Sequence, residues 1–401
     1  MTLSIRSSRN QLGLFALGML AVMFASVFIA PSSFRLGADR QPRGTIATIP
    51  ISSGGAIDGG LVAVDSDTNR AFVLAQNSEY TAAAGRQVGG MLSMLDGRKG
   101  TILNTSLLNF YPVALATGSQ LNHGFIIAGT AFGIDAGTSA LHVLDLRTGT
   151  IVQIVGLGAY ITDAAVDGHV GHVFVAEPDN QAVEMVDARR GILLQTIKLG
   201  QAPVHVVLSE DTDRLFISCV KEIIVLDTRT GAIVGRVNGT LGDTYMVDER
   251  TQRLFSTTGG VITTRDARQG LLLYTAKAFA QIDALAISTG TNRIFAASSG
   301  HNTVSVINAR TGNVLATVTI GFRPIALAVD AHLKRVLVVC QGDSRHRGAL
   351  YILDATSGRV VDTFSVGSRP VAIAINALTN RAFVLNADSG TVSVLDLGVS
   401  H

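Results

Sequence analysis

Short runs of alternating apolar and polar residues recur along almost the whole chain, separated by turn residues, and this pattern predicts β-strands. The pattern is complete in residues 303–324, with a strand over 303–307, a tight turn over 308–312, a strand over 314–320 and a bend at Pro324. Each such stretch follows two apolar strands joined by a polar hairpin, as in VAVDSDTNRAFVL at 62–74 and AIAINALTNRAFVL at 372–385. Each unit is therefore expected to hold four strands.

The turn between the third and fourth strands of a unit has Asp or Asn at its first place and Gly at its fifth. The first side chain accepts hydrogen bonds from the backbone of the turn, and glycine adopts a positive φ without steric cost. Seven copies begin at Asp96, Asp145, Asp187, Asp227, Asp266, Asn308 and Asp354. Their glycines are 39 to 49 residues apart, and such a period is typical of β-propeller blades.

First strands begin near residues 62, 113, 163, 204, 243, 284, 326 and 372. This count predicts an all-β fold, a β-propeller of eight four-stranded blades over residues 44–398. The last unit lacks a fourth strand, and residues 44–51 (GTIATIPI) match the fourth strand GNVLATVTI at 312–320. We expect residues 44–51 to complete the last blade and close the ring. Seven blades is the alternative, if one divergent unit does not form a blade.

The N-terminus differs from the rest of the chain. Residues 1–11 carry Arg6 and Arg9 and form a predicted cytoplasmic tail, and residues 12–30 contain no charge. As a helix these nineteen residues would be about 28 Å long, close to the hydrocarbon thickness of a bilayer. We interpret them as a transmembrane anchor; a signal peptide cleaved after Ser32 is the alternative. Either case places the propeller outside the cytoplasm, anchored or secreted, and makes residues 31–43 a linker.

The composition excludes several functions. Thirty-two basic residues balance 30 acidic ones, without a basic run, so we expect no nucleic-acid partner. Cys219 and Cys340 lie three blades apart, beyond the reach of about 7 Å that a disulfide needs, and are predicted to be buried thiols. His123, His169 and His172 fall in neighbouring hairpins, but their spacing is not that of a usual ligand set. No nucleophile motif is present, and we expect no metal, cofactor or catalytic residue.

Units such as TNRIFAASSGHNTVSVINARTGNVLATVTIGFRPIALAVD resemble the YVTN, or YncE-like, β-propeller repeat. The resemblance covers roughly residues 44–398, best in the last three units. It implies an exported binding or interaction module. Related propellers occur in amine-dehydrogenase subunits, cytochrome nitrite reductases and lactonases, but the haem-attachment motif is absent here and no lactonase site can be mapped.

Insertions between the second and third strands are the best indication of a site, because loops on a rigid scaffold often carry function. They occupy residues 76–90, 129–139 and 341–348, in blades that ring closure makes nearly consecutive. With the links between blades they supply the candidate ligand-binding residues, which are Tyr80, Arg86, Asp135, Arg323, Arg345, His346, Arg347 and Arg369. Glu79 and Asp343 lie in the same loops. The arginines favour a polar or acidic ligand or a partner surface.

From these observations we expect a membrane-anchored extracytoplasmic binding or protein-interaction module, rather than an enzyme, with an unknown protein or cell-envelope component as its partner. The alternative is an exported enzyme or redox-partner subunit with a site at the mouth of the propeller channel. The identity of the ligand does not follow from the sequence.

Overall fold

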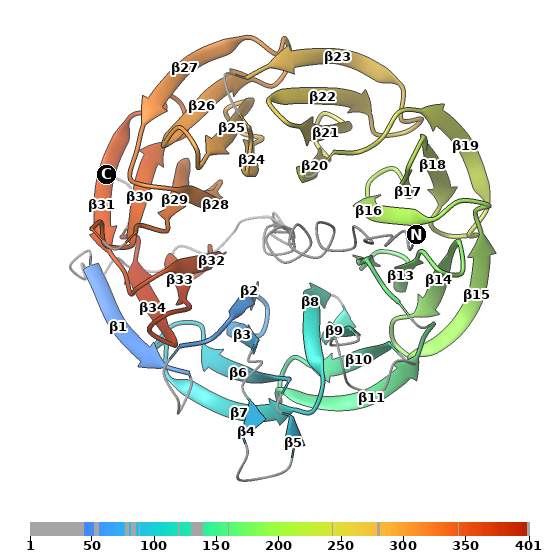
Figure 1. Ribbon diagram of the computed structural model, residues 1–401, viewed down its shortest axis with the longest axis horizontal. Coiled ribbons are helices and arrows are strands. Elements are labelled where there is room, and N and C mark those ends of the chain that lie inside the picture. The colour runs from blue at the N-terminus through green and yellow to red at the C-terminus, as the bar shows by residue number, and fades with distance from the viewer. Residues whose placement is uncertain are drawn as a thin grey trace, which may run out of the picture.

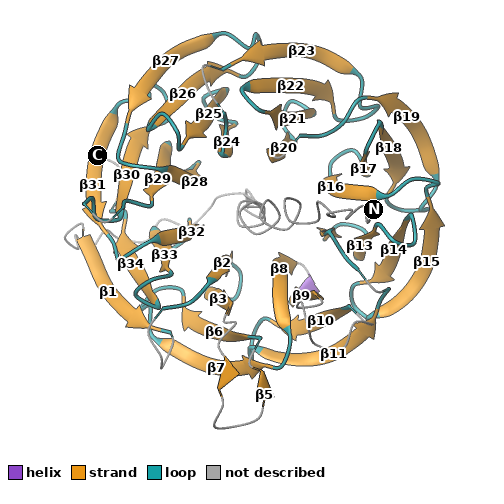
Figure 2. Cartoon of the chain, viewed as in Figure 1, coloured by secondary structure: helices purple, strands orange, loops and turns teal. Residues whose placement is uncertain are grey.

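The computed structural model describes residues 44–398, apart from 52–55, 77–79, 82–85, 88, 119–120, 130–138, 159, 243, 279–280 and 344. The described chain forms eight four-stranded antiparallel sheets arranged radially around one axis (Figure 1). Strands and loops make up nearly all of it (Figure 2). The predicted β-propeller of eight blades is confirmed. The seven-bladed alternative is wrong, because each divergent unit forms a complete sheet.

In each of the first seven blades the strands follow chain order from the inner strand to the outer one. Blades 1 to 4 consist of β2 (Gly59–Asp65), β3 (Arg70–Gln76), β6 (Gly90–Asp96) and β7 (Ile102–Leu108); β8 (Tyr111–Gly118), β9 (His123–Gly129), β10 (Ala140–Asp145) and β11 (Thr150–Gly156); β12 (Asp163–Asp167), β13 (His172–Glu177), β14 (Ala182–Asp187) and β15 (Ile192–Lys198); and β16 (Pro203–Ser209), β17 (Arg214–Cys219), β18 (Glu222–Asp227) and β19 (Ile233–Asn238).

The second half of the ring repeats this order. Blades 5 to 8 consist of β20 (Thr244–Asp248), β21 (Arg253–Thr258), β22 (Val261–Asp266) and β23 (Leu272–Lys277); β24 (Ala284–Ser288), β25 (Arg293–Ser298), β26 (Thr303–Asn308) and β27 (Val314–Thr319); β28 (Pro324–Asp330), β29 (Arg335–Cys340), β30 (Ala349–Asp354) and β31 (Val360–Ser365); and β32 (Pro370–Asn376), β33 (Arg381–Asn386), β34 (Thr391–Asp396) and β1 (Gly44–Pro50).

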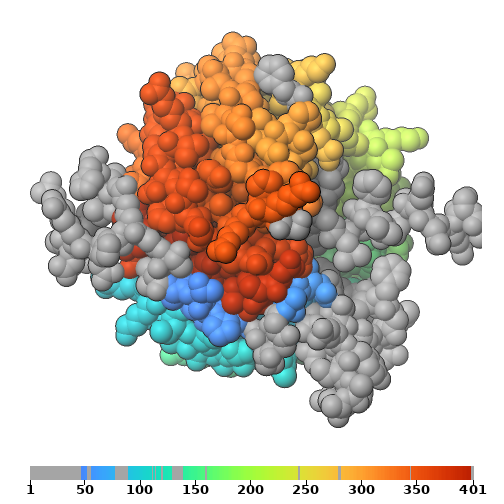
Figure 3. Space-filling view, turned by 60° about the vertical axis from the view of Figure 1, so that its left-hand side comes forward, coloured from blue at the N-terminus to red at the C-terminus, as the bar shows by residue number. Residues whose placement is uncertain are grey.

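The ring closes through β1. This strand pairs with β34 from Gly44 opposite Asp396 to Pro50 opposite Thr391. In Figure 3, the blue surface of β1 lies between the red surface of the last blade and the cyan surface of the first. The predicted donor of the missing strand is therefore confirmed, and both ends of the propeller are held in one sheet.

Two turns on one end of the propeller explain why the repeat folds as it does. At the turn between third and fourth strands, the side chain of Asp145 accepts hydrogen bonds from the backbone N–H groups of Arg147 and Thr148, and Gly149 has φ 72°. The other predicted copies share the side-chain bonds and the positive φ of glycine. Left-handed residues that favour Gly and Asn fix these turns.

The first hairpin of each blade ends in another left-handed residue, directly before the second strand. In blade 8 this is Asn380, with φ 52°, and its carbonyl accepts a hydrogen bond from the N–H of Leu397, just after the third strand. Each of the other seven blades has the equivalent bond. It joins the two turns of a blade at the same end of the sheet.

The core lies between the blades. The third residue of each second strand is a fully or almost fully buried large side chain, namely Phe72, Phe125, Phe174, Phe216, Phe255, Phe295, Leu337 and Phe383. Both faces of each sheet pack against neighbouring sheets, so the core consists of layers around the ring. Burial on both faces explains why the second strands are almost continuously apolar rather than alternating.

The outer strands form the free sheet edges. In every blade one residue of the outer strand has no partner on the third strand, so the edge carries a β-bulge. Seven of these bulged residues have described side chains and are 43–55% exposed aliphatics: Leu103, Val152, Leu194, Val234, Leu273, Leu315 and Val361. A bulge interrupts the ladder and protects an edge from pairing with another chain.

None of the described residues belongs to a helix long and apolar enough to cross a bilayer. The predicted cytoplasmic tail, membrane segment and linker, residues 1–43, lie outside the described residues.

Candidate functional site

The links between blades and the loops between second and third strands lie at one end of the propeller, which we call the link face. This follows from the strand order, because each inner strand begins where the preceding outer strand ended. The opposite end, which we call the turn face, carries the two structural turns described above. All the predicted ligand-binding residues belong to loops or links of the link face.

Two of these links share an unusual backbone. Arg323 and Arg369 each precede a proline and have φ values of 55° and 46°, in the left-handed region that a non-glycine residue seldom adopts. In both links the turned carbonyls accept hydrogen bonds from the start of the loop of the same blade. Gln341 N–H donates to the Arg323 carbonyl at 2.9 Å, and Ala387 N–H donates to the Arg369 carbonyl at 2.8 Å. The conformation therefore fixes each loop on its link.

The insertion of blade 7 forms a compact turn on its link. The Asp343 carboxylate accepts hydrogen bonds from the N–H groups of Arg345 and His346, both at 2.8 Å, and lies 2.7 Å from His346 Nδ1. These backbone and imidazole donors lower the pKa of Asp343. The imidazole stacks on the ring of Phe322 with centroids 5.1 Å apart and planes inclined by 10°. The turn is thus attached to the link through backbone, carboxylate and ring contacts.

Three arginines lie on the insertion of blade 7 and its link. Arg323, Arg345 and Arg347 are exposed, and their guanidinium groups make no hydrogen bond or ion pair with the residues that the structure describes. We call these three residues the basic corner. An arginine presents several donors in a fixed planar arrangement, and unpaired it suits a carboxylate or phosphate of a ligand.

Arg369 is placed differently from Arg323, although both occupy the same position of their blades. Its guanidinium forms an ion pair with Asp388 and donates to the backbone carbonyls of Ile57, at 2.9 Å, and Asp58, at 3.3 Å. These contacts join blade 8 to blade 1 at the point of ring closure. Arg369 remains a predicted ligand contact, but its guanidinium already donates to protein groups at the ring closure.

The other predicted residues are only partly described. The insertion of blade 1 contains a small hairpin, in which β4 (Tyr80–Thr81) pairs with β5 (Arg86–Gln87). In Figure 1 this hairpin projects beyond the outer strand β7. The side chains of Tyr80 and Arg86, and all of Glu79 and Asp135, lie outside the described residues, so their part in a site stays a prediction.

A second polar cluster, which the sequence did not reveal, lies where three neighbouring inner strands begin on the link face. The Asp163 carboxylate accepts hydrogen bonds from the Tyr245 hydroxyl and from the N–H of Val206, the latter at 3.1 Å. His205 Nδ1 lies 3.5 Å from the same oxygen. Burial, together with the Asp163 charge, raises the pKa of Tyr245 well above its ordinary value. The sequence does contain a signal for this cluster, because polar residues replace apolar ones where these three inner strands begin.

The three histidines considered as metal ligands point to other partners. His123 Nδ1 contacts the Ala188 carbonyl at 3.3 Å, and His172 Nδ1 contacts the Thr228 carbonyl at 2.8 Å. His169 Nε2 is 3.9 Å from Glu210. Within the described residues, no three His, Cys, Asp or Glu side chains are arranged to hold a metal ion.

The two cysteines are free and buried, as predicted. Burial raises the pKa of Cys219 to about 11 and that of Cys340 to about 12. Both thiols therefore stay protonated near neutral pH, and a protonated buried thiol is a poor nucleophile.

The comparisons with known proteins support the fold and leave the family open. No family model matches the sequence, and no curated protein matches it closely. Among solved structures, the chain is similar to the C-terminal WD40 domain of Sif2, with a TM-score of 0.67 and 13% identity over 90% of this chain and 99% of that one. At this identity the likeness shows the propeller fold alone.

Proposed function

We propose that this protein is a binding module whose basic corner receives an acidic segment of a protein partner. One observation carries the proposal: Arg323, Arg345 and Arg347 are exposed on one loop and link, without an ion pair to any described residue. Carboxylates complement guanidinium groups in charge and geometry.

The contacts that hold the basic corner in place strengthen this proposal. Arg345 and Arg347 flank His346, which is fixed by Asp343 and by the ring of Phe322. Arg323 belongs to the link on which the turn rests. A surface held in its binding conformation loses less conformational entropy when a partner arrives, so more of the interaction energy appears as affinity.

A binding measurement with poly-L-glutamate as the acidic probe tests the proposal. The variant Arg323→Ala/Arg345→Ala/Arg347→Ala should bind about tenfold more weakly, since three exposed pairs contribute about 0.5 kcal/mol each. The matched control is Arg147→Ala/Arg268→Ala/Arg310→Ala, which removes three exposed arginines from the turn face. Equal affinity of the two variants, or affinity that does not fall with added salt, would contradict the proposal.

We further propose that residues 12–30 anchor the propeller to a membrane and that residues 44–398 lie outside the cytoplasm. The uncharged stretch of nineteen residues supports this location. Alkaline extraction of membranes tests the anchor, and protease treatment of intact cells tests the side on which the propeller lies. Release of the chain by alkali, or N-terminal sequencing that begins after Ser32, would favour the secreted alternative.

We also propose that the repeat belongs with the YVTN, or YncE-like, propellers, on the strength of motifs such as TVSVINARTGNVLATVTIGFRP in blades 6 and 7. The exported enzyme or redox-partner subunit is the second candidate function. The cluster of Asp163, His205 and Tyr245 supports it, because a carboxylate close to an imidazole is a common catalytic pair. Co-purification with an oxidoreductase, or a bound cofactor that absorbs visible light, would favour this candidate over the binding module.

A further inference from the structure

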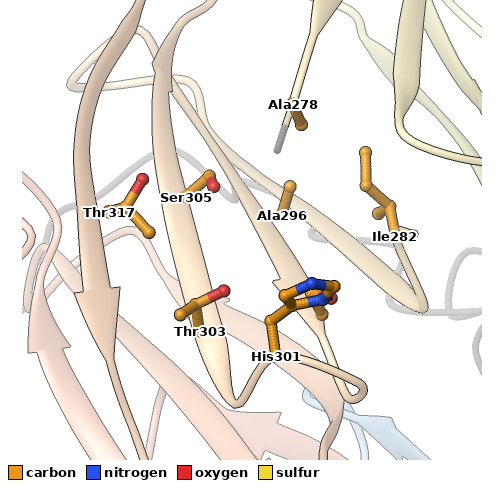
Figure 4. A pocket seen from close by; sticks show the side chains of 8 residues that line it. Ala278, Ile282, Ala296, His301, Thr303, Ser305 and Thr317 are labelled. Atoms are coloured by element: carbon orange, nitrogen blue, oxygen red, sulfur yellow. The ribbon is translucent and has the colours of Figure 1, made fainter. Parts of the chain in front are cut away.

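A cavity of about 100 Å³ lies beside blade 6, on the side of the link from blade 5. Among the described residues, eight side chains from blade 6 and that link line it: Ala278, Ile282, Ala296, Ser298, His301, Thr303, Ser305 and Thr317 (Figure 4). The alanines, the isoleucine and the two serines are buried, whereas His301 and Thr317 are exposed. The cavity therefore has a buried floor and an opening at the link face.

Part of the polar lining has no hydrogen-bond partner among the described residues. Ser298 Oγ lies 3.4 Å from His301 Nδ1. The hydroxyls of Thr303, Ser305 and Thr317 make no hydrogen bond to a described residue. In Figure 4 the Thr303 oxygen points toward His301, and the Ser305 oxygen is on the side of Ala296. Ser305 is 5% exposed, and a molecule in the cavity would give its hydroxyl a hydrogen-bond partner.

Blades 7, 2 and 8 fill the equivalent space with larger side chains. Ser305 pairs with Ala296 and Thr317, and the residue with the same pairing in blade 7 is Tyr351. The ring of Tyr351 lies against Gly321, where an added Cβ would come within 2.5 Å of it.

Blades 2 and 8 fill the space in two further ways. The residue equivalent to Ser305 in blade 2 is His142, which stacks on Phe110 with centroids 3.9 Å apart. In blade 8 the residue equivalent to Ser298 is Asn386, whose amide donates to Thr391 and Ser393. Blade 6 has small side chains at all these places, and the cavity results.

The lining restricts the chemistry of an occupant. His301 is the one ionisable side chain among the eight, so an ionised group on the floor would be buried beside Ala278, Ile282 and Ala296 without a compensating charge. The serine and threonine hydroxyls both donate and accept hydrogen bonds, as alcohol groups do. The apolar wall suits C–H groups. A cavity of 150 Å³ holds benzene, so 100 Å³ encloses about four non-hydrogen atoms, and a larger molecule would extend through the opening.

We propose that this cavity binds a small neutral polyol or the hydroxyl-bearing edge of a sugar, with Thr303, Ser305 and Thr317 bonding its hydroxyls and Ala278, Ile282 and Ala296 covering its carbons. The proposal is independent of the basic corner, which lies on blade 7 and its link.

The test uses the full chain with ¹³C-labelled histidines, in a detergent that contains no hydroxyl groups. Glycerol is the neutral probe and acetate is a charged probe of similar size. The signal of His301, identified by its loss in His301→Gln, should shift with glycerol and saturate with a dissociation constant in the range of about 1 mM or weaker. Acetate should give no saturable shift.

Two variants locate the site. Ser305→Ala keeps the space but removes a hydroxyl, and should raise the dissociation constant about fivefold. The matched control Ser93→Ala changes the equivalent residue of blade 1, whose hydroxyl lies 3.5 Å from that of Thr105, and should leave glycerol binding unchanged. Ser305→Tyr, which installs the residue of blade 7, should abolish binding. Shifts that do not saturate, tighter binding of acetate than of glycerol, or an unchanged dissociation constant in Ser305→Ala would overturn the proposal.

Discussion

Pro50 pairs with Thr391, and the next residue, Ile51, donates its N–H to the Gly390 carbonyl at 2.9 Å. The first described strand is thus joined to the last one along its whole length. The Ile51 side chain continues this junction, since it is 4% exposed and packs in the core that blades 8 and 1 share. Stability of the ring should depend on these few residues.

Ile51→Ala should lower the free energy of unfolding by about 2–4 kcal/mol, because it removes three buried carbons from the closing junction. Ile154→Ala is the control, since that side chain is 61% exposed on an outer strand and its loss should change stability by less than about 0.5 kcal/mol. Urea unfolding followed by circular dichroism measures both. Equal effects of the two substitutions would mean that the junction does not limit stability.

The two left-handed arginines should respond differently to the same substitution. Arg369→Ala removes donors to Ile57, Asp58 and Asp388, and should cost about 1–2 kcal/mol. Arg323→Ala removes a guanidinium without a partner among the described residues, and should stay within about 0.5 kcal/mol of the parent. Both variants keep the strained backbone, so the comparison isolates the side-chain bonds. Melting temperatures show which variant loses more stability, and a larger loss of stability in Arg323→Ala would contradict the prediction.

Glu184 gives the protein a pH-dependent weakness near neutrality. Burial, and to a lesser extent the charge of Glu177, raises the pKa of Glu184 from 4.5 to about 7. A carboxyl whose pKa is higher in the folded state contributes stability below its unfolded pKa and loses that contribution as the pH rises through the folded value. This group therefore favours the folded state at pH 4 and opposes it above pH 7.

Glu184→Gln should consequently stabilise the protein at pH 8 by about 1–3 kcal/mol, with a much smaller gain at pH 5. Asp179→Asn is the control, because it removes the same charge from an exposed turn of the same blade. Melting temperatures between pH 5 and pH 8 provide the measurement. A gain that is constant with pH, or the same in both variants, would show that Glu184 does not titrate there.

The hydroxyl of Tyr245 should contribute to the contact between blades 3 and 5. Tyr245→Phe leaves the Asp163 carboxylate with one donor fewer, and a hydrogen bond to a charged group contributes about 1.5–3 kcal/mol. Tyr351→Phe is the matched change, because it removes a hydroxyl for which no hydrogen bond is found among the described residues. Chemical unfolding should show a loss in the first variant and little change in the second. The reverse order would exclude Asp163 as the stabilising partner.

The sequence repeat predicts most of the fold. Asp145 and Gly149 form their turn from local bonds alone, and the alternation around them predicts strands, so blade number and boundaries follow. The donor of the closing strand is also predictable, because residues 44–51 have the pattern of a fourth strand and no blade of their own. The bulge in each outer strand is not predictable in this way, since in seven blades its extra residue is as apolar as the residue before it.

The sequence by itself determined the local features of this protein: turns, strands, the repeat and the loops where arginines gather. Only the tertiary structure decided which of those arginines are free. Arg323 and Arg369 each lie between a glycine two residues before and a proline directly after. Yet the Arg323 guanidinium has no partner among the described residues, whereas that of Arg369 binds a carbonyl more than 300 residues away. The cluster of Asp163, His205 and Tyr245 and the cavity of blade 6 were likewise decided by the tertiary structure. Each depends on which side chains meet across neighbouring blades or their links, and that contact is set by the packing of the ring rather than by spacing along the chain.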